Sequence, residues 1–238
     1  MKGFRRRLLI SINEESSEPD YSVLDTYGVA IMDVKSRFYK DAASWQSAGS
    51  PDVNGVAVSD GTHRFCIAKD IVSNVCNSDY HGLDAEYWGA YQKNVSGVAT
   101  ITDSTVAITD FNGVGNTDAI VENVIGTDGY FTKYPWSAAG LCKQFIFPNG
   151  ATGYLGACGE WYLVNNVRST VNSLLEAIGG TKLQFTNVLA DYGYYWTSTQ
   201  YNAANAWSWN FAQNKCGAYG KQSQTFRVRA FCEIGNKE

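Results

Sequence analysis

The sequence has little charge, few histidines and no long apolar segment, and each shortage argues against a class of protein. Charged residues are 18% of the 238 residues, below the usual quarter. The net charge of −4 argues against general nucleic-acid binding. No segment approaches the roughly 20 apolar residues of a membrane-spanning helix. We therefore expect a soluble protein with no nucleic-acid partner and no membrane insertion.

Motifs for metal binding and catalysis are also missing. The chain has only two histidines, His63 and His81, and its cysteines form no C-x-x-C pair, so a zinc site is not expected. There is no G-x-S-x-G, P-loop or H-E-x-x-H motif. The stretch FNGVGNTD at 111–118 lacks the dinucleotide fingerprint and is interpreted as a turn. We expect no cofactor, no metal ion and no catalytic residue.

The six cysteines do not require a disulfide framework. An even number allows three disulfides, but a chain of this length does not need them to fold. The basic tip at 2–7 is followed by an apolar stretch, 8–12, that is too short for the core of a signal peptide. We therefore expect free, mostly buried thiols. The cysteines are Cys66, Cys76, Cys142, Cys158, Cys216 and Cys232.

What the sequence has instead is aromatic and small polar residues. Aromatics make up 14% of the chain, and there are 23 glycines and 4 prolines. Rigid aromatics with Asn, Ser and Gly are typical of binding surfaces, where they give contact area and adaptable hydrogen bonds. A low-charge surface without any ligand has the same composition, so composition leaves both possibilities open.

Several segments are expected to be strands or helices. β-rich runs predict strands at 28–33, 55–60 and 63–70, the last two joined as a hairpin through Gly61 and Thr62. Helices are expected near 116–125 and 136–146, and the clearest one at 159–178. The last has an apolar stripe and is ended by Gly179-Gly180.

The C-terminal third is expected to be strand and loop. In AWSWNF (206–211), Trp207, Trp209 and Phe211 face one way, and Ser208 and Asn210 face the other. YYWTST (194–199) and FRVRAFCEI (226–234) are the other expected strands. The connection NKCGAYGKQSQT is expected to be rich in turns.

Six segments, taken in order, resemble a family of C-type-lectin-like domains that is related to the formylglycine-generating enzymes and common in gut Bacteroidales and their phages. They are GFRRRLL, GVAVSDGTHRFCIAKD, NGATGYLGACGEWYLVNN, VNSLLEAIGGTKL, YYWTSTQYNAANAW and FRVRAF. The family shows a G-[YW]-x-L-P-[ST]-x-x-E-[WL] helix start, an AIGG helix end, Y-W-[ST]-S-[TE] and A-W strands, and a closing V-R-[AP]-[FV] strand. The resemblance covers roughly 28–238.

The resemblance implies an α+β class and a C-type-lectin-like fold. It implies short antiparallel sheets, about two to three helices, long irregular loops, and paired N- and C-terminal strands. Residues 1–22 would form an arm or linker, and 23–238 a single domain. The chain lacks the proline of the helix-start motif, the active-site cysteine motif of the enzymes, and the E-P-N, Q-P-D and W-N-D calcium motifs of sugar-binding lectins. We therefore expect the fold without enzymatic activity and without calcium-dependent sugar binding.

Many members resemble the variable proteins of diversity-generating retroelements, in which adenine-directed mutagenesis rewrites Asn codons of a C-terminal region. The variable ligand-binding region would lie at about 194–231. Such mutagenesis cannot produce Trp, Gln, Lys, Glu or Met, so Trp207, Trp209 and Lys221 would be fixed. The residue types that it can produce, and that we expect to bind ligand, are at Tyr201, Asn202, Ala203, Ala204, Asn205, Ser208, Asn210, Ala212, Cys216, Gly217, Ala218, Tyr219, Ser223, Thr225 and Phe226.

The resemblance implies a ligand-binding protein that displays a hypermutated surface to a protein or glycan receptor on a cell surface. Its expected location is a phage tail or a bacterial surface, with the N-terminal arm as the attachment point to other virion or surface proteins. Two alternatives stay open. One is a structural adhesin or fibre subunit with no diversified site. The other is an enzyme on the formylglycine-generating-enzyme-like fold.

Overall fold

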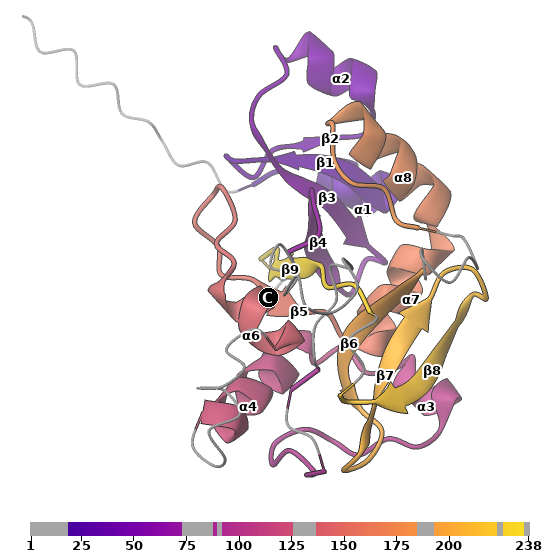
Figure 1. The fold of residues 1–238 in the computed structure, drawn as a ribbon. Helices are drawn as coiled ribbons and strands as arrows, with labels where there is room; N and C mark the ends of the chain where they lie inside the picture. The colour runs from indigo at the N-terminus through magenta and orange to yellow at the C-terminus, as the bar shows by residue number, and fades with distance from the viewer. Residues whose placement is uncertain are drawn as a thin grey trace, which may run out of the picture.

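The computed structural model describes residues 19–72, 88–89, 92–125, 137–184, 193–222 and 226–235. Two sheets built from antiparallel strand pairs organise them (Figure 1). The larger sheet has the order β2-β1-β3-β4-β9-β5, and the smaller has the order β6-β7-β8. The strands are β1 Val29–Asp33, β2 Phe38–Tyr39, β3 Val53–Ser59, β4 Arg64–Ala68, β5 Tyr154–Leu155, β6 Tyr194–Gln200, β7 Asn205–Asn210, β8 Lys215–Gly220 and β9 Ala230–Glu233.

Helices accompany both sheets, so the expected α+β class is confirmed. The described part of the chain contains seven helices, where two to three were expected. The extra ones are short and are started by side-chain caps such as Asp41 and Asp103, so they carry little apolar periodicity. The helices are α1 Ser22–Tyr27, α2 Ala42–Ser47, α3 Ser104–Ala107, α4 Gly113–Ile125, α6 Ala138–Gln144, α7 Cys158–Asn166 and α8 Arg168–Ala177.

The expected single helix at 159–178 is two helices. α7 and α8 meet at Val167, whose φ of −117° and ψ of 16° interrupt the helix. The apolar stripe continues across the break, and for this reason the periodicity did not reveal it. The expected end is confirmed: Gly179 is left-handed, and the amide of Gly180 donates to the carbonyl of Leu175 at 2.7 Å, which is a Schellman motif.

The strands expected at the N-terminal side are present. β3 and β4 pair antiparallel, with Ser59 opposite Arg64, as the hairpin prediction required. The stretch 111–118 is not a turn, because α4 begins inside it at Gly113. Its glycines lowered the apparent helix propensity, but the helix packs against β5 and α6, and this tertiary packing outweighs the propensity.

The C-terminal strand is shorter than expected, and its neighbours in the sheet differ from the expected ones. Only Ala230–Glu233 of the segment 226–234 is a strand. β9 lies between β4 and β5, while β1 lies between β2 and β3. The expected pairing of the N- and C-terminal strands is therefore wrong. Alternation along a strand shows its two faces, but it does not identify its neighbours.

Two hydrophobic cores cover opposite faces of the six-stranded sheet. One core contains Leu24 of α1 and buried residues of α4 and α6. The other contains Trp161 of α7 and buried residues of α8. Trp161 joins the two sheets, because its ring lies 4.8 Å from that of Phe231 in β9 and 4.9 Å from that of Tyr195 in β6. The three-stranded sheet is thus anchored to the larger one through α7.

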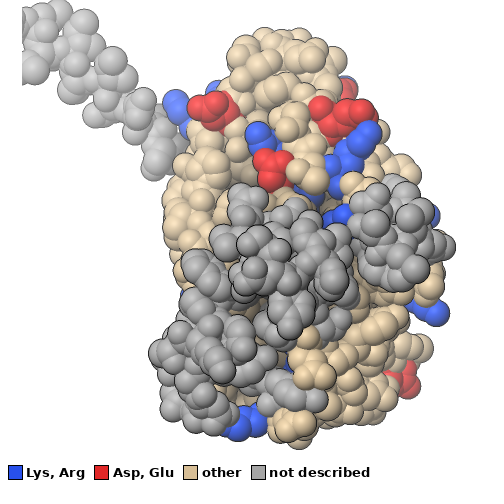
Figure 2. All heavy atoms as spheres, viewed as in Figure 1, with Lys and Arg blue, Asp and Glu red and all other residues tan. Residues whose placement is uncertain are grey.

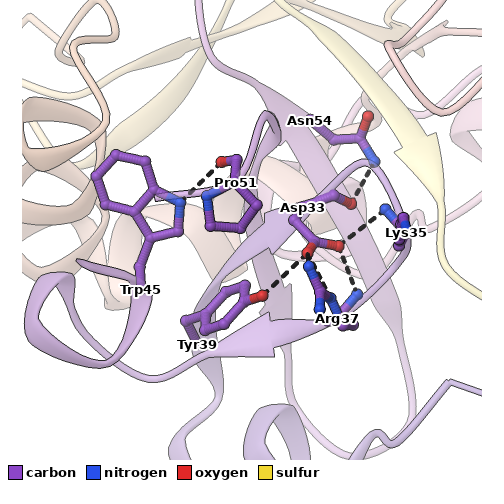
Figure 3. Close-up of polar contacts among 7 residues, drawn as sticks. All are labelled: Asp33, Lys35, Arg37, Tyr39, Trp45, Pro51 and Asn54. Atoms are coloured by element: carbon purple, nitrogen blue, oxygen red, sulfur yellow. Dashed lines mark hydrogen bonds and ion pairs between the residues drawn. The ribbon is translucent and has the colours of Figure 1, made fainter. Parts of the chain in front are cut away.

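A buried carboxylate holds the turn after β1 (Figure 3). Asp33 accepts hydrogen bonds from the amides of Lys35 and Arg37 at 2.8 and 2.9 Å, from Nε of Arg37 at 2.7 Å, and from the hydroxyl of Tyr39 at 3.0 Å. Burial alone would raise the pKa of Asp33, but these hydrogen bonds hold it below its ordinary value. Asn54 completes the cluster by donating to the carbonyl of Asp33.

The N-terminal arm was expected to end at residue 22, and the structure shows where the folded domain begins. Residues 1–18 lie outside the described residues. Tyr21 already packs against the domain, with its ring 5.7 Å from that of Phe38 and beneath the guanidinium of Arg64. Ser22 begins α1. The last residues assigned to the arm therefore belong to the folded domain.

Candidate ligand-binding surface

The connection after β7 that was expected to be rich in turns contains a strand. Residues 215–220 form β8, which pairs with β7 over six residue pairs, from Asn205 opposite Gly220 to Asn210 opposite Lys215. Gly, Asn and Lys are uncommon in strands, so the composition predicted a loop, but pairing with β7 overrides that preference. In the described part of the chain β8 pairs only with β7, so it is an edge strand.

The aromatic side of β7 supports the sheet as expected. Trp207, Trp209 and Phe211 are all buried in one core with Tyr195. The indole of Trp207 also donates to the carbonyl of Ile101 at 2.8 Å, which satisfies its only polar atom. The prediction that these three aromatics share one inward face is confirmed.

The opposite side of β7 is also covered, and here the sequence-based expectation is corrected. Ser208 and Asn210 were expected to face outward, but their exposures are 0% and 2%. The hydroxyl of Ser208 donates to the carbonyl of Gly217, and the side-chain oxygen of Asn210 accepts from the amides of Ala212 and Gln213. Alternation predicts that two faces exist, but it cannot show whether the second one reaches solvent.

The turn between β6 and β7 is the most continuous accessible part of the predicted site. All five residues from Tyr201 to Asn205 are partly exposed. The side-chain oxygen of Asn202 accepts from the amides of Ala204 and Asn205 at 2.9 and 2.8 Å. Asn202 therefore builds the turn as an Asx motif and has a structural role that the codon argument did not reveal. The ring of Tyr201 packs edge-on against Trp207.

Residues of β8 alternate between the core and the surface. Cys216 is buried against the core of Trp209, while Tyr219 on the other side is 36% exposed. The hydroxyl of Tyr219 donates to that of Tyr194 at 3.2 Å, and both rings contact Phe226. Gly217 and Ala218 are partly exposed. Gly217 lies on the side of Tyr219, whereas Ala218 lies opposite Trp207 and packs against the same core as Cys216.

A buried lysine holds the turn and β8 together, and sequence reasoning missed this role. The amide of Lys221 donates to the carbonyl of Ala204 at 2.9 Å. Its ammonium donates to Gln200 Oε1 and to the carbonyl of Lys93, both at 2.8 Å, and lies over the ring of Trp88. Burial lowers the pKa of Lys221 to about 7. A lysine that adenine-directed mutagenesis cannot create thus supports the surface from below.

The remaining predicted residues divide between buried, half-buried and undescribed positions. Phe226 is buried at 4% exposure, and Ala212 is half-buried. Ser223 and Thr225 lie outside the described residues. We name the accessible set, Tyr201–Asn205 with Gly217–Tyr219, the 201/219 surface. Figure 2 shows mainly uncharged residues over the region of β6–β8, with the charged side chains of this face gathered mostly above it.

A separate cavity of about 140 Å³ lies at one end of the larger sheet. Glu160 lines it, accepting from the hydroxyl of Tyr154 and the amide of Ala157, both at 2.6 Å. Burial raises the pKa of Glu160 to about 8, so this carboxyl is largely protonated at neutral pH. The imidazole of His63 stacks on Phe111 at its wall. Glu160 also starts α7, because its bond from the amide of Ala157 is one half of a capping box.

The described residues were also compared with the requirements of a metal site, a disulfide and a membrane-spanning helix. Among the described residues, no three of His, Cys, Asp and Glu lie close enough together to hold a metal ion. The five described cysteines are free and buried, as expected, and Cys76 lies outside the described residues.

No helix in the described ranges is long and apolar enough to cross a membrane. Comparisons with protein-family models, with curated proteins and with solved structures found no match.

Proposed function

We propose that this chain is a ligand-binding protein on a C-type-lectin-like fold, and that it presents the 201/219 surface to a receptor on a cell surface. In this proposal the surface is diversified in the manner of the retroelement variable proteins, and the protein belongs to a phage tail or a bacterial surface. The ligand is a protein or glycan. The chain acts by binding and not by catalysis.

One observation supports this proposal above the others. The accessible predicted residues come together on two adjacent segments, because Asn205 lies opposite Gly220 and Ala206 lies opposite Tyr219. Trp207 and Trp209 of β7, and Lys221 directly after β8, are all buried and all of types that adenine-directed mutagenesis cannot produce. A fixed core below a set of small, uncharged and replaceable residues is what a diversified surface requires.

The energetics of the surface also favour binding. Tyr201 and Tyr219 can each supply apolar contact area with a hydroxyl at its edge. The turn residues between Asn202 and Asn205 add polar groups and small side chains. Such paratope-like mixtures bind through a few aromatic anchors surrounded by adaptable hydrogen bonds.

The protein-level test measures attachment of the labelled full-length chain to a panel of bacterial cells. Tyr219→Ser together with Asn205→Thr should abolish attachment to any strain that the wild type binds, while the melting temperature stays nearly unchanged. The matched control is Tyr27→Ser, which removes an aromatic that is 56% exposed on α1. Equal losses in both variants, or none in either, would argue against the proposal.

The DNA around the gene gives an independent test. An adenine-rich near-repeat of the sequence encoding 194–231 beside a reverse transcriptase gene is expected. Sister copies should differ at positions such as Tyr201, Ala203 and Tyr219 while Trp207 and Trp209 stay the same. Identical residues at 201–205 and 216–220 in all copies would leave the alternatives, a fixed structural subunit or an enzyme that uses the Glu160 cavity.

A further inference from the structure

The cavity at one end of the larger sheet has a carboxyl group inside and another at its opening. Glu160 of α7 lines it and is 4% exposed, whereas Glu233 of β9, also in its wall, is exposed. Glu233 lies directly opposite Phe65 of β4, so the two side chains stand on the same face of the sheet. The two carboxyls therefore belong to one site.

The carboxyl of Glu160 can accept more hydrogen bonds than the protein gives it. One oxygen accepts from the hydroxyl of Tyr154 and the other from the amide of Ala157. An ionised carboxylate has about four acceptor positions, so two remain for a donor in the cavity. Glutamine serves equally well in a capping box. The start of α7 therefore does not explain why this buried residue is an acid.

Among the described residues of the cavity wall, no permanent cation faces these carboxyls. Arg64 is the only one of them with a permanent positive charge. Its side chain lies on the other face of β4 from that of Phe65. There its guanidinium donates to Asp25 at 2.5 Å and lies over the ring of Tyr21. The positive charge of Arg64 is thus already paired outside the cavity.

Other acidic groups add to the negative charge around Glu160. Asp110, just before α4, is half-buried, and Asp60 bonds to the imidazole of His63 at 3.1 Å in the turn between β3 and β4. Burial is the largest cause of the raised pKa of Glu160, and the charges of Asp110 and Glu233 raise it further. A bound cation would offset this repulsion, whereas a bound anion would add to it.

The walls between the two carboxyls are mostly apolar. Phe65, Phe111 and Val114 line the cavity. Its volume of about 140 Å³ is far more than the roughly 10–15 Å³ that one buried water requires. A short alkyl chain would find contacts on these walls, and aromatic rings also attract cations. The cavity therefore suits a small cation that carries an apolar chain.

We propose that this cavity binds a primary ammonium group on a short alkyl chain. The three N–H donors of the ammonium reach the open acceptor positions of Glu160 and the carboxylate of Glu233, while the chain lies against the apolar walls. The ligand is a free aliphatic amine or a lysine side chain, which share this chemistry. The site contains no residue of the 201/219 surface, so this inference does not depend on the proposed function.

The test titrates isotope-labelled full-length protein with n-butylammonium chloride and follows the amide shifts of residues 154–160 by NMR. We expect saturable shifts with a millimolar dissociation constant, because so small a ligand makes few contacts. Butanol and butyrate, which are neutral and anionic compounds of similar size, should bind at least about tenfold more weakly. Nα-acetyl-lysine methylamide distinguishes the two sources. Shifts of the same amides assign the site to lysine side chains, and their absence assigns it to free amines.

Variants connect the binding to the carboxyls. Glu160→Gln should weaken the binding of butylammonium at least about tenfold while the chain stays folded, because glutamine retains the cap. Glu233→Gln should weaken it about threefold, since an exposed charge is screened by solvent and salt. The matched control is Glu176→Gln, at an exposed carboxyl of α8, which should leave the affinity unchanged.

The pH dependence gives a second readout. The ammonium favours the ionised form of Glu160, whose pKa in the free protein is about 8, so binding releases a proton. The affinity of the wild type should therefore rise about fivefold or more from pH 6 to pH 8, and that of Glu160→Gln should not.

Three results would overturn the proposal: equal binding of butanol, an unchanged affinity in Glu160→Gln, or no saturable shift at 154–160. If Glu160→Gln does not fold, Glu233→Gln and the comparison of butylammonium with butanol on the wild type decide.

Discussion

The turn after β1 and the turn after β6 both reverse the chain, but groups of different charge hold them. In the first, the buried carboxylate of Asp33 receives hydrogen bonds from Arg37, Lys35 and Tyr39 (Figure 3). In the second, the neutral amide of Asn202 accepts from the two amides that follow it. Charged hydrogen bonds are stronger and cost more to leave unmade. The first turn therefore tolerates little change, and the second tolerates much.

The largest expected effect comes from Trp161, the residue that joins the two sheets from which these turns extend. Trp161→Ala removes a fully buried ring that contacts Phe231 of the larger sheet and Tyr195 of the smaller. We expect the free energy of unfolding to fall by about 3–5 kcal/mol, because a large cavity remains. Urea denaturation measures the loss. The neighbouring Tyr162→Ala, at a residue that is 37% exposed, should cost less than about 1 kcal/mol, and equal costs would contradict this packing.

Asp33→Ala should come next and tests the charged turn directly. Backbone amides and the Tyr39 hydroxyl lose their shared acceptor, so we expect a loss of about 2–3 kcal/mol at neutral pH. The folded-state pKa of Asp33 is lowered, so its contribution is present above the ordinary value and disappears as the pH falls through the folded value. The gap between wild type and variant should therefore close in acid. Asp52→Ala, at an exposed position just before β3, serves as the control, and a gap that stays constant with pH would contradict the assignment.

Glu160, in the helix α7 that joins the two sheets, makes stability depend on pH with the sign opposite to that of Asp33. Its pKa rises from 4.5 to about 8 on folding. The folded protein therefore holds a proton that the unfolded chain has released, and stability falls as the pH rises across this interval. The slope approaches about 1.4 kcal/mol per pH unit. Lys221, with a pKa of about 7, has the opposite effect and offsets this loss of stability above that pH.

Glu160→Gln should flatten this dependence. Urea denaturation at pH 5 and pH 6 compares the two proteins below the folded-state pKa of Lys221, where this lysine is mostly charged in both states. The wild type should lose stability between these pH values, while the variant should change little. Parallel pH profiles would show that Glu160 is already ionised in the folded protein.

The sequence could reveal the elements that have a clear apolar period, and it could not reveal the others. The β-rich runs predicted β1, β3 and β4, and the aromatic alternation correctly placed Trp207 and Trp209 inside, because a strand with one apolar face has a clear period. The break at Val167 and the strand β8 were missed. Pairing with β7 overrides the local preference of β8. At Val167 the apolar stripe continues across the break, so the periodicity does not reveal it.

Only part of the predicted site is accessible, because sequence patterns do not show which residues the rest of the chain covers. Codon reachability and alternation identify residues that can change, but solvent exposure depends on what the rest of the chain covers. Ser208 and Asn210 are therefore buried although the pattern predicted an outward face. Asn202 and Asn210 each build an Asx turn, and an Asn followed by small or turn-forming residues was the available signal.

The smallest expected changes in stability are for substitutions on the 201/219 surface. They test directly whether the turn after β6 tolerates more change than the turn built on Asp33. Ala203→Thr and Asn205→Thr should each change the free energy of unfolding by less than about 0.5 kcal/mol, because both side chains are partly exposed. Asn202→Ala in the same turn should cost about 1 kcal/mol, since two amides lose their acceptor. Urea denaturation of the three variants resolves this difference. A cost above about 1.5 kcal/mol at Ala203 or Asn205 would mean that the turn is as constrained as the one built on Asp33, and a surface so constrained could not accept the range of residues that the proposed function requires.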